Sequence, residues 1–179
     1  MPWSDNNVYL DAGYGRTSYD RINKLAITSE TEGKWNYWAF TKNVATGSMK
    51  IYLNGILWHS GVAKTKRMLD IKAFSIGKGN WAGSQTYEGQ IDEFAVFNTE
   101  LSQSTIQAYM NKKIDATHPN YANLALYYHF DDGNFVTAID VAPFGHLPAT
   151  LTSVDNPLKN SNDLIFNFSQ TMLRPNITF

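Results

Sequence analysis

The sequence predicts an all-β, antiparallel β-sandwich with one short helix. Short apolar runs separated by turn residues fill the first two thirds of the chain, which is the spacing of sandwiches and barrels. Asn54-Gly55 lies between the apolar runs 49–53 and 56–59, and this dipeptide fits a type I′ hairpin turn because both turn residues there need positive φ. Only one segment, which begins at Ser102, has helical spacing.

The remaining strands are expected wherever apolar runs lie between turn signals. The run 34–42 is apolar on both faces, so we expect a central strand covered on both sides. Residues 62–70 are basic and predict a loop, and the polar residues 152–163 predict a loop or linker. The other expected strands cover residues 8–10, 21–28, 73–78, 88–97, 124–130 and 164–168.

The helix is expected to run from an N-cap at Ser102 to near Ile114. Ser is a preferred N-cap residue because its hydroxyl accepts a hydrogen bond from a free amide of the first turn. Ile106, Tyr109 and Met110 recur at helical spacing behind it.

Composition excludes several classes of protein. The 179 residues carry a net charge of −1, so no broad basic field exists to attract nucleic acid. No apolar run has the length of a membrane span, and no signal peptide is visible. The chain has no cysteine, which rules out disulfides and thiolate metal sites. Because the start reads like the middle of a domain, we expect the chain to be part of a longer protein.

Three segments resemble the laminin-G-like, concanavalin A-like jelly-roll domain of bacterial surface and secreted proteins. Residues 35–40 are similar to that family's W-x-H-x-A strand, and residues 51–55 to its hydrophobic-Y-hydrophobic-D/N-G hairpin. Ile76-Gly77, followed by residues 89–94 and by Leu101-Ser102, is similar to the family's closing series. The resemblance implies a jelly-roll sandwich in an extracellular or cell-surface protein.

The resemblance divides the chain in two. Residues 1–116 are similar to the later strands of such a domain, and residues 117–179 contain a motif at 124–140 that resembles its opening. We expect the C-terminal segment to pack on the first and to fill its missing strand positions. Alternatively, the C-terminal segment begins a second domain and the first is left with an open edge. Because an open sheet edge invites pairing, we favour the first arrangement, within one chain or through a symmetric partner.

The acidic residues near position 90 give little support to catalysis. In a regular strand Asp92 and Glu93 point to opposite faces, and Glu88 and Asp92 lie about 13 Å apart. A retaining glycosidase needs two carboxyl groups about 5–5.5 Å apart and an inverting one about 6.5–9.5 Å. We therefore expect no enzyme, with Asp92 fixing backbone amides and Glu93 solvated. The four histidines show no zinc spacing.

Calcium is the metal that the sequence favours, because it binds carboxylate and carbonyl oxygens. Residues 131–134 form an oxygen-rich turn that an ordinary Asp-Gly turn would also explain. The family resemblance implies a calcium site between the opening turn and the I-D-E strand. Its candidate ligands are Asp92, Asp131, Asp132 and Asp140.

Glycan binding needs exposed aromatic rings beside amide or carboxylate groups. Trp81, with Asn80, Gln85 and Tyr87, lies in a glycine-flanked loop, although Trp81 could also anchor that loop. Tyr14 and Tyr19, between Asp11, Arg16 and Asp20, form a second candidate group. The basic run 64–67 favours a solvated loop over an anion site.

The sequence thus predicts a non-catalytic accessory module that binds a glycan or an extracellular protein. A structural spacer or self-association domain, including a homodimer, is the alternative, and a glycoside hydrolase ranks last. The predicted ligand-binding residues are Asn80, Trp81, Tyr87, Tyr14 and Tyr19.

Overall fold

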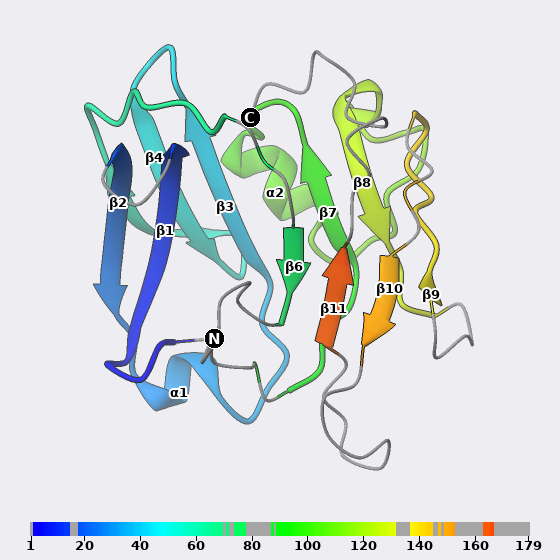
Figure 1. The fold of residues 1–179 in the computed structure, drawn as a ribbon, viewed down its shortest axis with the longest axis horizontal. Helices are drawn as coiled ribbons and strands as arrows, with labels where there is room; N and C mark the ends of the chain where they lie inside the picture. Colours follow the sequence, from blue (N-terminus) through cyan, green and yellow to red (C-terminus); the bar gives the residue numbers. More distant parts are fainter. Residues whose placement is uncertain are drawn as a thin grey trace. The chain divides into compact units, whose positions relative to one another are not determined.

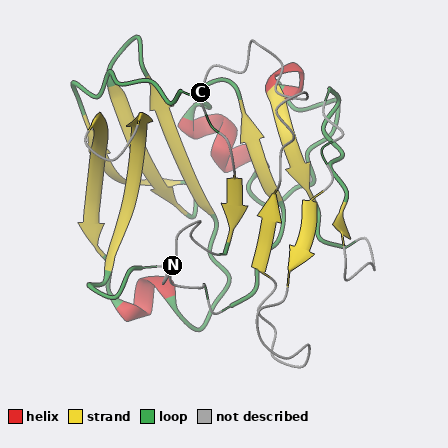
Figure 2. Cartoon of the chain, viewed as in Figure 1, coloured by secondary structure: helices red, strands yellow, loops and turns green. Residues whose placement is uncertain are grey.

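The computed structural model describes residues 2–14, 18–69, 71, 74–77, 87, 89–131, 137–144, 147, 149–152 and 163–166. Strands dominate these residues and helices are few (Figure 2). Every strand pair is antiparallel. The predicted all-β class is therefore confirmed. None of the helices described is long and apolar enough to cross a membrane.

The chain divides into two compact units. The first contains the described residues within 2–69 and 99–121, and the second contains those within 71–98 and 122–166.

The first unit opens with a long hairpin of β1 (Asn7–Tyr14) and β2 (Ser18–Leu25), side by side in Figure 1. Its register runs without a bulge from the pair Asn7–Leu25 to the pair Tyr14–Ser18. Side chains alternate between two faces along a strand, so the hairpin has an inner and an outer face. Gly13 pairs with Tyr19, and a Cβ at residue 13 would lie 2.4 Å from the Tyr19 Cα. This close approach requires glycine.

A three-stranded sheet completes the first unit, in the order β3 (Trp38–Asn43), β4 (Ser48–Leu53), β5 (Ile56–Gly61). The turn between β4 and β5 has φ of 51° at Asn54 and 76° at Gly55, which confirms the predicted hairpin. The inner face of β1–β2 packs on this sheet. The buried apolar residues of that core are Val8, Ala12, Ile22, Ala26, Met49 and Ile51.

Two expectations for the first unit were wrong. The run 34–42 is not a central strand, because β3 starts at Trp38 and pairs, among the described strands, with β4 alone. Trp35, which precedes β3, is 65% exposed, so the continuous apolar pattern of this run does not reflect burial on both sides. A short helix, α1 (Thr28–Thr31), lies where the sequence gave no helical signal.

The main helix, α2 (Gln103–Tyr109), begins as expected and ends early. The Ser102 hydroxyl accepts a hydrogen bond from the Thr105 amide at 3.1 Å, which confirms the N-cap. The helix ends at Tyr109 with Met110 as its C-cap, and the Lys112 amide then bonds the Tyr109 carbonyl in a tight turn beyond it. Ile106 is its buried residue.

The described residues of the second unit form two sheets. One pairs β7 (Phe94–Phe97) with β8 (Leu124–Tyr128). The other has the order β6 (Phe74–Ile76), β11 (Asp163–Phe166), β10 (Ala149–Thr152), β9 (Thr137–Ala138). A 3-10 turn at Tyr121–Asn123 precedes β8. The buried core residues come from β6, β8, β9 and β10: Ile76, Leu126, Tyr128, Ala138 and Ala149.

Strand pairing links the two segments into which the sequence was divided. β7 pairs with β8, and β6 pairs with β11, so strands from before and after residue 116 share both sheets of the second unit. The domain boundary at residue 116 stays a prediction. The strand predicted over 88–97 is shorter than expected, because Glu93 has a left-handed φ of 53° and β7 starts only after it.

Candidate functional site

The outer face of the β1–β2 hairpin exposes aromatic rings around one arginine. Tyr9 and Asp11 project from β1, and Tyr19 and Arg21 project from β2, on the face opposite the core. Trp3 precedes β1 and is 43% exposed, and Tyr19 is 37% exposed. We call Trp3, Tyr9, Arg21 and Tyr19 the aromatic strip.

Arg21 lies between the two tyrosines of the aromatic strip. Its guanidinium carbon is 4.6 Å from the Tyr9 ring centroid and 5.1 Å from the Tyr19 ring centroid, within the range of cation–π contacts. The Trp3 ring meets the Tyr9 ring edge-on, with centroids 6.3 Å apart. The rings and the guanidinium therefore hold one another in place along the hairpin.

Carboxylates fix the polar ends of the aromatic strip. Arg21 donates from Nε and Nη2 to the two oxygens of Asp11, at 2.7 and 2.6 Å. This bidentate contact raises the pKa of Arg21, so its charge persists. The Tyr9 hydroxyl donates to Asp5 Oδ2 at 2.5 Å. That hydrogen bond, followed by one from the Asn7 amide, lowers the pKa of Asp5, and the same contact raises the pKa of Tyr9.

The structure separates the residues that the sequence had grouped around Tyr19. Asp20 follows Tyr19 but is buried on the inner face, where it pairs with Lys42. Tyr14 ends β1 opposite Ser18, one position beyond the Gly13–Tyr19 pair. Arg16 lies outside the described residues. Trp3, Tyr9 and Arg21 were not among the site residues predicted from the sequence. Their side chains come together only because β1 pairs with β2, and no sequence motif signals that pairing.

The glycine-flanked loop is only partly described. Asn80, Trp81 and Gln85 lie outside the described residues, so a ligand site there stays a prediction. The amide of Tyr87 donates to the Gly77 carbonyl at 2.6 Å. Its ring lies against Gly89, where a Cβ would be 2.7 Å from the phenol carbon. Tyr87 thus packs on its own loop.

The predicted calcium ligands are held in different ways. Asp140 is buried and accepts hydrogen bonds from three backbone amides, those of Tyr127, Ala142 and Leu147, at 2.9, 3.0 and 3.3 Å. Oδ1 accepts two of these hydrogen bonds and Oδ2 accepts one, so the amides account for the burial of this carboxylate. Asp92 Oδ1 accepts from the Glu93 amide at 3.0 Å.

The other two predicted calcium ligands, Asp131 and Asp132, add no support for a calcium site. Asp131 is exposed, and Asp132 lies outside the described residues. In the part of the chain that the structure describes, no three acidic or histidine side chains are grouped to hold a metal. The calcium site stays a prediction.

A polar cluster on β8 was also missed. The Tyr127 hydroxyl donates to Glu93, and His129 Nδ1 lies 3.2 Å from Glu93 Oε1. His129 follows the end of β8, and its ring lies against the Tyr127 ring, with centroids 4.3 Å apart. The Glu93 carboxylate is therefore bonded within the protein, whereas we expected it to be solvated. The distance estimated between Glu88 and Asp92 assumed that both lie on one face of a regular strand. Asp92 precedes β7, and Glu88 lies outside the described residues.

Comparison with known proteins identifies one family. The laminin G model described as the concanavalin A-like lectin/glucanases superfamily matches residues 3–107, which span β1 to most of α2. No curated protein and no solved structure matches the chain. Laminin G-like domains are generally non-catalytic and usually extracellular, although the superfamily also includes glycosidases.

Proposed function

The chain belongs to the concanavalin A-like lectin/glucanases superfamily, and from this premise we propose that it is a non-catalytic module that binds a glycan along the aromatic strip. One observation carries the proposal: Tyr9 and Tyr19 flank Arg21 on an exposed strand face. We place the module outside the cell or at the cell surface, as part of a larger protein.

The aromatic strip offers both kinds of contact that a sugar needs. Flat rings pack against the C–H face of a pyranose, and charged or amide groups bond its hydroxyls. Arg21 uses Nε and Nη2 for Asp11, which leaves the two donors of Nη1 for a ligand. Each Asp11 oxygen has a second lone pair that can accept from a hydroxyl.

The strip is also organised before a ligand arrives. Tyr9 is held by Asp5, Arg21 by Asp11, and Asn23 by Asn7 at 3.0 Å. Side chains that are already ordered lose little entropy on binding, which favours affinity for a small, flexible ligand. This order favours a glycan over a protein partner, although an extracellular protein could use the same rings.

The proposal is tested by binding measurements on Tyr19→Ala and Tyr9→Ala against a panel of polysaccharides, by affinity electrophoresis. Either substitution removes a ring that contacts Arg21, and we expect affinity to fall by roughly tenfold. Trp35→Ala is the matched control, because Trp35 is an exposed aromatic residue of the same unit outside the strip. Equal loss in Trp35→Ala, or no loss in the tyrosine variants, would overturn the proposal.

A self-association module is the second candidate, and β5 supports it. Among the described strands β5 lies at an edge of its sheet, and it exposes Ile56 at 60% and Leu57 at 43%. Apolar edge strands favour pairing with another chain. Sedimentation of the wild type and of Leu57→Lys tests this candidate: a dimer that the substitution dissociates supports it, and a monomeric wild type refutes it.

A further inference from the structure

The members of the aromatic strip form a row along the β1–β2 hairpin. Tyr9, Asp11 and Gly13 follow one another on the outer face of β1, and Arg21 and Tyr19 lie opposite the last two. Two residues of an antiparallel strand advance about 7 Å, so Tyr9, Arg21 and Tyr19 occupy successive positions along the strands. The register has no bulge, and the row therefore runs parallel to the strands.

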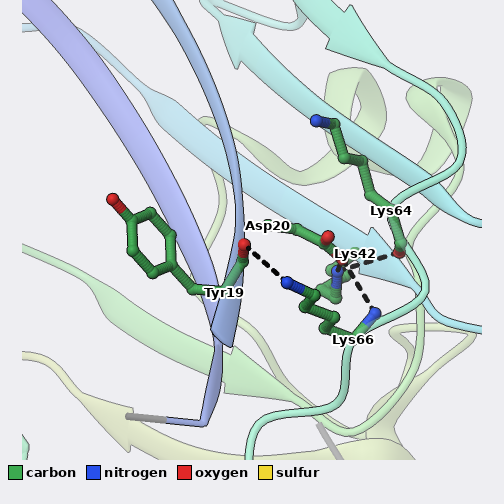
Figure 3. A network of polar contacts seen from close by, with 5 residues as sticks. All are labelled: Tyr19, Asp20, Lys42, Lys64 and Lys66. Carbon is green, nitrogen blue, oxygen red and sulfur yellow. Dashed lines mark hydrogen bonds and ion pairs between the residues drawn. The ribbon is translucent and has the colours of Figure 1, made fainter. Parts of the chain in front are cut away.

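The row lies on the side of β2 that faces away from the core. Figure 3 shows the Tyr19 ring on the side of β2 opposite Asp20 and Lys42. Asp20 is buried, and it accepts from Lys42 Nζ at 2.9 Å and from the Lys66 amide at 2.8 Å. The exposed Tyr19 ring thus takes no part in this inner network and stays open to a ligand.

Trp3 extends the row because a tight turn bonds it to the start of β1. The turn covers residues 3–6, and we call it the Trp3 turn. The Trp3 amide donates to the Asn7 carbonyl at 2.9 Å, and the Asn6 amide donates to the Trp3 carbonyl at 2.8 Å. Asn6 has a left-handed φ of 61°, which asparagine adopts more readily than most residues. Trp3 is therefore held at the end of the row next to Tyr9.

Asp5 ties the Trp3 turn to the row. Its Oδ1 accepts from the Asn7 amide at 3.0 Å, and its Oδ2 accepts from the Tyr9 hydroxyl. One carboxylate thus fixes both the turn that carries Trp3 and the ring against which Trp3 packs.

Neighbouring members of the row are about one sugar unit apart. The Trp3 and Tyr9 ring centroids are 6.3 Å apart, and the Arg21 guanidinium carbon is 4.6 Å from the Tyr9 centroid and 5.1 Å from the Tyr19 centroid. A β-1,4-linked glycan is extended and repeats at a similar spacing, whereas an α-1,4-linked glycan coils. A single sugar can contact one or two members of the row, and an extended chain can contact all of them.

The charges of the row favour a neutral chain. Arg21 is already paired with both oxygens of Asp11, at 2.7 and 2.6 Å. An anionic ligand would compete with Asp11 for the guanidinium and would be repelled by the Asp5 carboxylate beside Tyr9. A sugar hydroxyl, by contrast, can accept from Nη1 of Arg21 without breaking the ion pair.

We propose that the aromatic strip binds a neutral, extended β-1,4-linked glycan along several consecutive sugar units, and that Trp3 forms the subsite at one end of the row. This inference rests on the proposed function and names its ligand class and one specificity-determining residue. Trp3 then contacts only those chains that extend past Tyr9, and it contributes affinity only to them.

A length series tests the inference. Isothermal titration calorimetry uses β-1,4-linked gluco-, manno- and xylo-oligosaccharides from the disaccharide to the hexasaccharide, with the α-1,4-linked malto-oligosaccharides for comparison. We expect the wild-type affinity for at least one β-1,4-linked series to rise with chain length and then to level off. Trp3→Ala should lower the affinity for the hexasaccharide about tenfold. It should leave the disaccharide unaffected, because a short chain can still bind at Arg21 and Tyr19, and that result also shows that the variant is folded.

The matched control is Trp35→Ala, which removes an exposed tryptophan of the same unit outside the strip. A rise with length that Trp3→Ala flattens and Trp35→Ala preserves supports the inference. Four results overturn it: equal affinity for short and long chains, equal losses in the two tryptophan variants, equal binding of the malto-oligosaccharides, or no binding of any β-1,4-linked series. The proposed function survives each of these if Tyr9→Ala and Tyr19→Ala still weaken binding to a polysaccharide of the panel. If no polysaccharide of that panel binds, the proposed function falls, and the inference with it.

Discussion

Asp20→Asn should be among the most damaging single substitutions in the first unit. Asp20 and Lys42 form a buried ion pair at 2.9 Å, and Asp20 also accepts from the Lys66 amide. Removing one partner of a buried pair leaves the other charge uncompensated, which costs about 3 kcal/mol. In a chain of this size that loss corresponds to a melting temperature lower by about 6–12 °C.

The effect of Asp20→Asn should depend on pH with a defined sign. Burial by itself raises the pKa of Asp20, but the hydrogen bonds from Lys42 and the Lys66 amide outweigh it and hold the pKa below its ordinary value. The stabilisation is therefore complete above the pKa of unfolded aspartate, about 3.9, and is lost as the pH falls through the lower folded-state pKa. The difference in stability between wild type and variant should shrink in acid.

The matched control is Asp11→Asn, which breaks an ion pair whose side chains are 44% and 41% exposed. Such pairs contribute less than about 1 kcal/mol. Thermal melting at pH 7 and pH 3 measures both variants. The argument is refuted if Asp20→Asn melts within about 2 °C of Asp11→Asn at pH 7, or if its deficit does not shrink at pH 3.

Three further predictions concern backbone strain, a buried carboxylate and calcium. Gly55→Ala should lower the melting temperature, because φ is 76° and a Cβ would lie 2.9 Å from Gln107 Cγ. Gly33→Ala is the control: φ is 71° there and no atom lies near the Cβ position, so it measures the backbone strain without the clash. Asp140→Ala should cost about 2–4 kcal/mol in urea unfolding, because three backbone amides lose their acceptor. A calcium site that includes Asp131 would raise the melting temperature on adding Ca²⁺, and Asp131→Asn would abolish the rise; no change in the wild type contradicts the site.

Local signals predicted the local features of the fold well. Asn54-Gly55 identified its hairpin because few residue pairs accept two positive φ angles, and Ser102 identified the start of α2 because its hydroxyl bonds the first turn. The family motifs predicted the sandwich because each motif is also local: it is a turn or a strand of fixed length.

Long-range features could not be predicted in the same way. Glu93 looked like a strand residue, but its left-handed φ and its contacts with Tyr127 and His129 depend on β8, more than 30 residues later. Trp35 and Trp38 have the same chemistry, yet the first is exposed and the second packs against the core. Burial is decided by which strands meet, and apolar character alone does not determine it.

The register of one hairpin links stability to the proposed binding face. Tyr19, Asp20 and Arg21 are consecutive, so strand alternation places the middle residue in the core and its two neighbours on the aromatic strip. A slip by one residue would expose Asp20, bury Arg21 and break the hydrogen bond from the Lys66 amide to Asp20. The Gly13–Tyr19 pair opposes that slip. A Cβ at residue 13 would lie 2.4 Å from the Tyr19 Cα, so only glycine fits at this position of the hairpin. Asp20 therefore has two roles, because its carboxylate pairs with Lys42 in the core and also accepts the hydrogen bond from the Lys66 amide.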